Sequence, residues 1–243
     1  MLGNRLVVVA DAHLGAAPSG NDDRFLAFLD QVPDLGDALL VNGDLFDFWF
    51  SYRRVIPRAG FRAAAALTTL ARRLPVLMTG GNHDRWGGSF WRDDAGIRYE
   101  PAEIRFQAAG LDILALHGDG VADVHRTGRM IHRITRHPAT SWFYRLLHPD
   151  FGIALVDRMS HRLADATRDP AVLDRAGARQ ELWAIEKLRA DPSLELLVMS
   201  HTHRPALAEP FPGRRYLNPG AWIDEQRFAV VTATGVELRQ FEG

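Results

Sequence analysis

Val76 to Arg85, read as V-L-M-T-G-G-N-H-D-R, is the stretch that organises the rest of the chain. Its apolar residues form a short run bounded by Pro75 and a glycine pair, a pattern typical of a buried parallel strand that ends in a tight turn. Asn82, His83 and Asp84 therefore follow the carboxyl end of a strand, the edge at which open α/β sheets bind ligands. Gly, Asn and Asp also favour turns on conformational grounds alone. By itself the motif fits either a turn or a site that holds a metal and moves a proton.

Similar polar motifs follow other short apolar runs of the chain. Asp11 and His13 are two residues apart, as are His201 and His203, and in extended backbone each pair leaves the chain on one face, where both side chains can bind one cation. Asp44 follows a glycine that permits a sharp turn, and its carboxylate beside that of Asp11 is repulsive unless a cation lies between them. Five such strand ends in order predict a metal site at one sheet edge. The candidate residues are Asp11, His13, Asp44, Asn82, His83, Asp84, His117, His201 and His203.

Composition narrows the class of protein. The 243 residues, 47% hydrophobic and 24% charged, are typical of a globular protein and suit one α/β domain, 1–243, with an insertion. Because Cys is absent, disulfides and thiolate metal sites are excluded, and any metal must be bound by His, Asp, Glu or Asn. A formal net charge of -1 argues against nucleic acid as a partner. With neither a signal peptide nor a membrane-spanning run in the sequence, we expect a cytoplasmic protein.

Hydrophobic periodicity predicts alternating strands and helices. Three helices are expected, and the first should end near Pro33, because proline disrupts a helix interior. Residues 86–100 are expected to form a loop with a short helix or strand. The expected helices are Asn21–Gln31, Arg58–Arg73 and Val172–Ala190. The expected strands are Leu6–Ala10, Ala38–Val41, a run from Val76, Glu103–Phe106 in a hairpin with Leu111–Leu116, Leu194–Met199, Arg215–Leu217, Phe228–Thr232 and Val236–Phe241.

An insertion is predicted between the last two parts of the site. About eighty residues separate His117 from His201, whereas a crossover between parallel strands needs only about a dozen. The excess, roughly residues 121–169, interleaves apolar and aromatic residues with many Arg. This pattern is typical of an amphipathic helical lid that presents an apolar face to lipid or membrane and Arg to phosphates. It equally fits a small helical subdomain with its own core and a solvated basic face.

The ordered motifs D-A-H, G-D-L-F-D, G-N-H-D, H-G-D and H-T-H closely resemble those of the calcineurin-like metallophosphoesterases, which are D-x-H, G-D-x-x-D, G-N-H-[DE], H and G-H-x-H. The resemblance spans nearly the whole chain. One departure is Ser200, where glycine is usual. The resemblance implies an α/β/β/α sandwich of two sheets flanked by helices, with residues 121–169 as a helical lid, and a hydrolase that uses two divalent metal ions.

The family resemblance also implies a ligand set. Asp44 would bridge the metals, since each carboxylate oxygen can bind one cation and hold the pair about 3.5–4 Å apart. Nitrogen and oxygen ligands without sulfur suit Mn²⁺, which we expect, as well as Fe or Zn²⁺. The implied ligands are Asp11, His13 and His203 for one metal and Asn82, His117 and His201 for the other.

Further residues are implied in catalysis. The metals would lower the pKa of a shared water and give a hydroxide for in-line attack on phosphorus. His83 would donate a proton to the leaving oxygen or stabilise the charge of the transition state, with Asp84 orienting its ring. Asp47 and Asp119 would contact the metal ligands and orient them without binding the metals themselves.

Within the family, the chain resembles the UDP-2,3-diacylglucosamine diphosphatases. The shared features are H-G-D before an Arg-rich helical insertion, G-D-L-F-D-F-W, H-T-H-R-P, and a G-A-W tail ending in V-E-L. That branch cleaves the pyrophosphate of a lipid nucleotide in lipid A biosynthesis, usually with Mn²⁺, and releases UMP and an acylated sugar phosphate. The resemblance implies a lipid-nucleotide substrate and peripheral contact with the inner membrane through the lid. His83 departs from the branch, whose best-described members carry Arg there.

Two other functions compete with this one. A phosphodiesterase or phosphatase that acts on nucleotides or other soluble phosphoesters is favoured if the lid leaves an open, polar cleft. A non-catalytic scaffold that binds proteins should have lost metal ligands, and no position of the motif set has lost one in this sequence.

Overall fold

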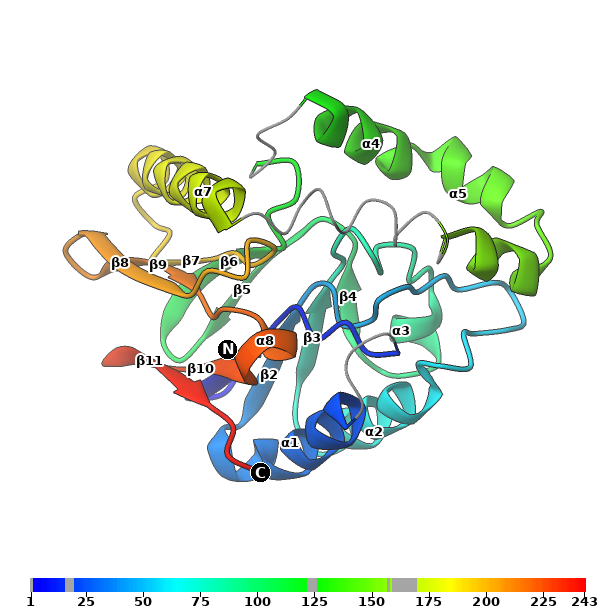
Figure 1. Cartoon of the computed structure of the whole chain (residues 1–243). Coiled ribbons are helices and arrows are strands. Elements are labelled where there is room, and N and C mark those ends of the chain that lie inside the picture. The colour runs from blue at the N-terminus through cyan, green and yellow to red at the C-terminus, as the bar shows by residue number, and fades with distance from the viewer. Residues whose placement is uncertain (1, 16–19, 122–125, 157, 159–169) are drawn as a thin grey trace.

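The computed structural model describes the chain except residues 1, 16–19, 122–125, 157 and 159–169. Two β-sheets lie face to face, and helices cover their outer faces (Figure 1). The order of layers is helix, sheet, sheet, helix. The α/β/β/α sandwich predicted from the sequence is therefore confirmed.

The first sheet contains β1 (Arg5–Val9), β2 (Ala38–Asn42), β3 (Val76–Thr79), β4 (Arg98–Glu100), β10 (Arg227–Thr232) and β11 (Gly235–Gln240). Their order across the sheet is β11-β10-β1-β2-β3-β4. Strands β1 to β4 are parallel, so their carboxyl ends lie at one edge, while β10 pairs antiparallel with β1 and with β11. Every residue of β2 and β3 is buried, as expected for strands with helices on one face and a second sheet on the other.

The second sheet contains β5 (Glu103–Ala108), β6 (Leu111–Leu116), β7 (Leu196–Val198), β8 (Ala206–Phe211) and β9 (Arg214–Asn218). Their order is β5-β6-β7-β9-β8. Strands β6, β7 and β9 are parallel, and the outer strands β5 and β8 pair antiparallel with β6 and β9. The predicted hairpin is confirmed as β5 and β6.

Helices complete the sandwich. α1 (Asn21–Leu35) and α2 (Phe61–Ala71) pack on the first sheet, and α7 (Pro170–Ala190) packs on the second. A separate apolar cluster fills the space between the sheets. Phe25 and Phe28 of α1 are fully buried, so their helical spacing marks the core face of that helix. Two short helices, α3 (Phe90–Asp93) and α8 (Trp222–Glu225), lie in loops.

The described part of the predicted insertion is helical. It contains α4 (Arg126–Arg136), α5 (Pro138–Tyr144) and a helical segment at 149–156, while residues 122–125, 157 and 159–169 of the expected range lie outside the described residues. Trp86 Nε1 donates to Thr135 O over 3.1 Å, and the Tyr144 ring packs on Trp86 with their centroids 5.3 Å apart. No helix in the described ranges is both long and apolar enough to span a membrane.

The first helix extends four residues beyond the predicted bound at Gln31 and ends at Leu35, two residues after Pro33. Pro33 has no backbone N–H group and therefore cannot donate to Leu29 O. The last turn is nevertheless closed, because Gly36 N donates to Val32 O over 2.9 Å and the Val32 side chain is fully buried.

Two elements were not predicted. β8 contains Pro210 and an irregular register between Ala208 and Phe211, which an edge strand tolerates because one of its sides needs no ladder hydrogen bonds. α8 is a single turn and is too short to show a helical period.

Candidate metal centre

The carboxyl ends of β1, β2 and β3 in the first sheet face those of β6 and β7 in the second. Asn42, at the end of β2, joins the two sheets, since its Nδ2 donates to Leu116 O over 3.0 Å and to Ser200 Oγ over 2.6 Å. His201 N donates to Asp11 Oδ2 over 3.1 Å. Residues almost two hundred positions apart in the sequence therefore lie side by side at one rim.

The backbone at this rim is strained. Asp11, His13, Asp44, His201 and His203 have φ angles between 45° and 73°. They are five of the seven non-glycine residues with positive φ in the described part of the chain. Such conformations cost roughly 1–3 kcal/mol each and persist where the surrounding structure enforces them, typically at functional sites. The strain is concentrated at the residues that the sequence motifs single out.

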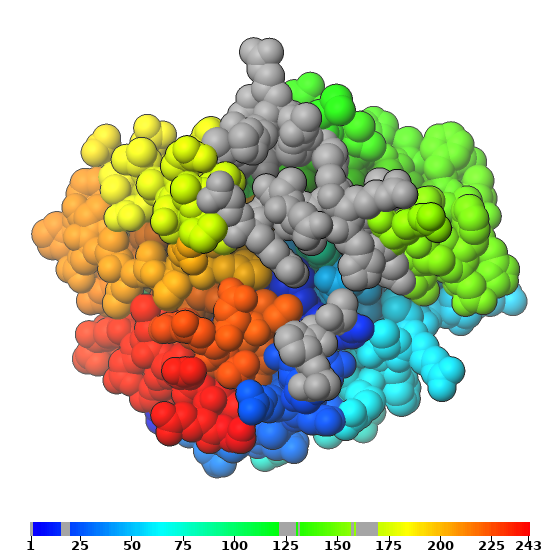
Figure 2. All heavy atoms as spheres, in the orientation of Figure 1, coloured from blue at the N-terminus to red at the C-terminus, as the bar shows by residue number. Residues whose placement is uncertain are grey.

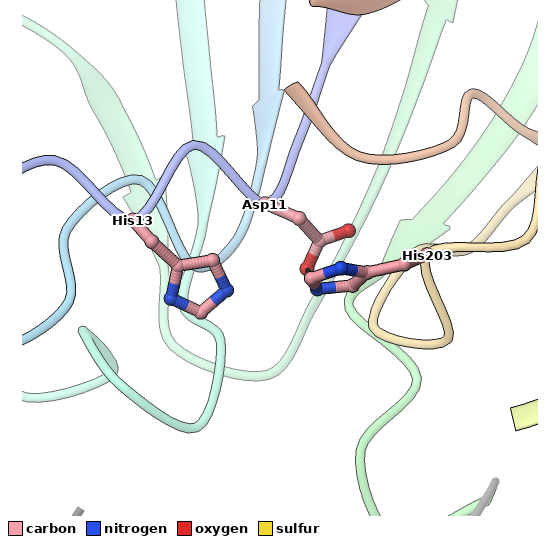
Figure 3. Close-up of side chains that lie close together, drawn as sticks. All are labelled: Asp11, His13 and His203. Carbon is pink, nitrogen blue, oxygen red and sulfur yellow. Dashed lines mark ion pairs between the residues drawn. The ribbon is translucent and has the colours of Figure 1, made fainter. Parts of the chain in front are cut away.

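Asp11, His13 and His203 form the first group of potential ligands. Each offers an atom within 4.8 Å of the others, and His203 Nε2 lies 3.7 Å from Asp11 Oδ1. In Figure 3 the Asp11 carboxylate lies beside the His203 ring, and the His13 ring is on its other side. Asp224 of α8 contacts the far nitrogen of His203, with 2.9 Å between its Oδ2 and Nδ1. This contact leaves Nε2 of His203 for a metal.

Asp44, His117 and His201 form the second group, with the same 4.8 Å limit. Asp44 Oδ2 is 3.1 Å from His117 Nε2 and 4.0 Å from Nε2 of His13, which belongs to the first group. The Asp44 carboxylate therefore lies between the two groups, where a bridging ligand would be needed. Asp44, His13 and His83 form a third, overlapping group.

The residues present fit a metal pair. Asp11 Oδ1 and Asn82 Oδ1 are buried and have no hydrogen-bond partner. Unpaired buried oxygens are costly, and cations satisfy them. The surrounding donors are imidazole nitrogens, carboxylate oxygens and one amide oxygen, a set that binds divalent transition metals.

The pKa shifts in the metal-free centre agree with metal binding by these residues. Burial raises the pKa of Asp11 above its usual range. Burial also disfavours the charge on Asp44, but His117 and His83 outweigh it and hold the Asp44 pKa well below normal. Burial, reinforced by His117, lowers the pKa of His201 to about 3, so His201 is a neutral imidazole at physiological pH and can bind a metal directly.

The structure corrects the expected role of Asp84. Its carboxylate does not orient the His83 ring but accepts hydrogen bonds from three backbone N–H groups, those of Gly81 (2.8 Å), Leu45 (2.7 Å) and Asp44 (3.3 Å). Successive residues of a tight turn point apart, and Asp84 is fully buried beneath the loop. It fixes the backbone that carries Asp44.

Asp47 provides the contact that Asp84 was expected to make. The backbone O of Asp47 lies 2.6 Å from Nδ1 of His83, and its carboxylate lies 3.6 Å from Nδ1 of His13. Burial lowers the pKa of His83, but Asp44 and the Asp47 carbonyl raise it above the ordinary value. A raised His83 pKa favours the protonated ring that a proton donor beside the metal groups needs.

Asp119 was expected to support a ligand; its carboxylate interacts electrostatically with His117 and His201, but its hydrogen bonds come from arginines. The buried carboxylate pairs with Arg85, and its Oδ2 lies 3.0 Å from Nη2 of Arg136 on α4. Arg136 also donates to Asp119 O over 2.5 Å. Asp119 therefore ties the insertion to the loop that carries His117.

Sequence reasoning missed three further residues at the site. Asp224 lies in a one-turn helix, His132 lies on α4 with its ring centroid 6.0 Å from that of His201, and Gln180 of α7 donates to Ser200 O over 2.8 Å. None of them belongs to a strand-end motif. The only signal for Gln180 is its place on the buried face of a helix.

Comparisons with known proteins agree with this centre. A family model described as calcineurin-like phosphoesterase matches residues 4–205. UDP-2,3-diacylglucosamine hydrolase of Shewanella sp. (strain MR-7) is 27% identical over 237 residues, covering 97% of both chains. The protein of the same name from Shewanella baltica is 26% identical and covers 97% of this chain and 96% of that one.

Solved structures that resemble the chain are more distant. An archaeal phosphodiesterase superimposes with a TM-score of 0.49 at 12% identity over 98% of each chain. A single mutant of Vps29 from Entamoeba histolytica gives a TM-score of 0.45 at 15% identity over 98% of this chain and 99% of that one. The family model covers most of the chain, including every strand-end motif. The chain therefore belongs to the calcineurin-like phosphoesterase family and is a metal-dependent hydrolase.

Proposed function

We propose that this hydrolase cleaves the pyrophosphate bond of a UDP-2,3-diacylglucosamine-like lipid nucleotide and releases UMP and an acylated sugar phosphate. The observation that carries the proposal is the length of the match to the UDP-2,3-diacylglucosamine hydrolases. It covers 97% of both chains and so takes in the insertion as well as the metal-binding motifs. The substrate would place its pyrophosphate at the rim formed by Asp11, Asp44 and His117.

Two metal ions, when bound, would supply a hydroxide nucleophile and neutralise the phosphoryl oxygens. One ion would be held by Asp11, His13 and His203. The other would be held by Asn82, His117 and His201, and Asp44 would bind both ions. Asp84 keeps the Asp44 backbone in place through its three N–H contacts. His83, aligned by Asp47, would protonate the leaving phosphate oxygen. We propose Mn²⁺ as the preferred ion, with Fe and Zn²⁺ compatible with the same donors.

The insertion, residues 121–169 within a single domain 1–243, is proposed as a lid that meets the acyl chains. Several of its large apolar side chains are exposed, with 56% of Trp142, 63% of Phe143 and 66% of Leu146 accessible. Such side chains suit lipid or the surface of the inner membrane, and a cytoplasmic enzyme would reach a lipid substrate there. Figure 2 shows the described part of the insertion, in green, at the upper right of the molecule.

A substrate comparison tests the proposal. Release of UMP from UDP-2,3-diacylglucosamine is measured with Mn²⁺ and after chelation, alongside hydrolysis of bis-p-nitrophenyl phosphate. We expect Mn²⁺-dependent UMP release at a far higher kcat/KM than hydrolysis of the diester. Turnover of the diester alone would exclude the lipid-nucleotide substrate while leaving the metal-dependent hydrolase intact.

One observation favours a second candidate, a phosphodiesterase or phosphatase that acts on soluble phosphoesters. His83 stands in the general family motif G-N-H-D, and its ring lies 4.8 Å from that of His13, inside the metal centre. A protonated imidazole can serve the leaving group of many phosphoesters without recognising a lipid. Higher kcat/KM for nucleotide diesters than for the lipid nucleotide would favour this candidate.

A further inference from the structure

The edge of the first sheet at β4 carries a pocket that the metal centre does not use. Its volume is about 620 Å³, within the usual range of small-molecule sites, roughly 300–1,000 Å³. The pocket is bounded by the loop after β3, by α3, by β4 and by the end of α5 in the insertion. No predicted metal ligand lines it. Its polar and aromatic walls include Trp86, Arg92, Arg98, Tyr99, Ser141 and Arg145.

The pocket is cationic. Among the described residues no ion pair is recorded for Arg98 or Arg145, and Arg92 pairs only with its sequence neighbour Asp93. Arg98 donates one hydrogen bond, to Arg105 O at 3.3 Å, which leaves most of its guanidinium N–H groups available. Glu100 is the one acidic residue in the lining, against three exposed arginines. The surplus of positive charge favours an anionic ligand.

The pocket walls are held in place. Tyr99 Oη donates to Arg85 O over 2.7 Å, which fixes the ring against the loop that follows His83. Arg145 lies over the Phe50 ring, with its Cζ 5.8 Å from the centroid, and Phe50 is itself buried. A rigid aromatic floor with guanidinium groups at the rim needs little rearrangement to bind a ligand.

We propose that this pocket is a second, non-catalytic site that binds a phosphate ester. Guanidinium groups match the oxygens of phosphate through paired hydrogen bonds, and the Trp86, Tyr99 and Phe50 rings suit the organic part of an ester. The ester is either a free small molecule or a phospholipid headgroup. Trp142 and Phe143 next to Ser141 are exposed and would accompany a lipid.

Calorimetric titration of the full chain with glycerol 3-phosphate tests the free-ester source. It is run with Mn²⁺ bound and again after EDTA dialysis, which removes binding at the metal centre. Sedimentation with phosphatidylcholine vesicles, with and without phosphatidylglycerol, tests the lipid source. The test variant is Arg98→Ala/Arg145→Ala. The matched control is Arg175→Ala/Arg179→Ala, which removes the same charge from exposed positions of α7.

In the chelated wild type we expect one of the probes to bind. The test variant should bind it at least about tenfold more weakly, because it loses charge-assisted hydrogen bonds, and the control should bind it as the wild type does. Binding of the soluble ester identifies a free ligand, and binding only of phosphatidylglycerol vesicles identifies a lipid headgroup. A circular dichroism melt checks that both variants fold. If the chelated wild type binds neither probe, or if both variants lose binding equally, the pocket is not a phosphate site. Neither result bears on the metal centre.

Discussion

Nδ1 of His203 lies 2.9 Å from Oδ2 of Asp224. The histidine ends the H-T-H motif after β7, and the aspartate belongs to the one-turn helix α8, 21 residues further on. The hydrogen bond with His203 lowers the pKa of Asp224. A carboxylate on the far nitrogen of a metal-binding imidazole fixes the ring and increases its basicity. Asp224 is therefore part of the metal centre without being a ligand.

Asp224→Asn should weaken metal binding by about 10- to 100-fold, because the His203 ring loses its charged partner. Calorimetric titration of the chelated protein with Mn²⁺ measures the change. Asp174→Asn is the matched control, since Asp174 pairs with Arg204, the residue after His203, on the surface. Equal Mn²⁺ affinity in the two variants would contradict a supporting role for Asp224.

His83→Gln should lower kcat by about 10²- to 10⁴-fold, the usual contribution of a general acid, while two metals stay bound. The loss should be smaller for bis-p-nitrophenyl phosphate, because nitrophenolate leaves without protonation. Elemental analysis of the purified variant gives its metal content. A variant that loses metal and activity in parallel would make His83 a ligand instead of a proton donor.

Asp44→Asn should abolish metal occupancy and activity together. Asparagine tolerates the left-handed backbone at this position, φ 50°, so the change removes the charge without adding strain. Metal content and turnover are measured on the same preparation, with wild type as reference. Retained turnover would exclude a bridging role for Asp44.

The rim of the sandwich was predictable because it depends on local patterns. Apolar runs followed by glycine or a polar turn mark strand ends, and parallel strands place those ends at one edge. The sequence therefore predicts where Asp11, Asp44 and His201 lie. The position of Asp224 could not be predicted, because its contact with His203 depends on the path of the chain after β9. The predicted direction of the Asp84 side chain was also wrong. Sequence adjacency suggested a contact with His83, whereas the turn aims the carboxylate at backbone N–H groups of two strand ends.

Ser200→Gly should destabilise the protein by about 1–2 kcal/mol and keep its activity. Asn42 Nδ2 donates to Ser200 Oγ over 2.6 Å in the fully buried seam between the sheets, and the variant loses that hydrogen bond and gains flexibility when unfolded. Urea unfolding of the chelated protein measures the difference. Ser200→Ala separates the two effects, because it removes the hydroxyl alone. An unchanged unfolding midpoint in both variants would show that Ser200 contributes nothing to the seam.

Metal binding should release a proton from His117 near neutral pH. Burial alone lowers the pKa of this imidazole, but Asp44, 3.1 Å away, and Asp11 raise it from 6.5 to about 10. The metal-free protein therefore keeps this proton at neutral pH, and a metal must displace it from Nε2. Because the folded-state pKa is raised, the proton stabilises the metal-free fold fully below pH 6.5, and that stabilisation is lost as the pH rises towards 10.

Two measurements check this. Titration calorimetry with Mn²⁺ in buffers of different ionisation enthalpy should show release of at least about one proton, that of His117, whereas His201 is already neutral. The apparent Mn²⁺ affinity and the Tm gap between metal-bound and metal-free protein should both grow with pH across the interval from 6.5 to 10, since the competing proton is progressively lost. His148→Gln, at an exposed histidine of the insertion, is the control and should not alter the buffer dependence. Binding enthalpies that are identical in all buffers would show that Asp44 and His117 share no proton before the metal arrives.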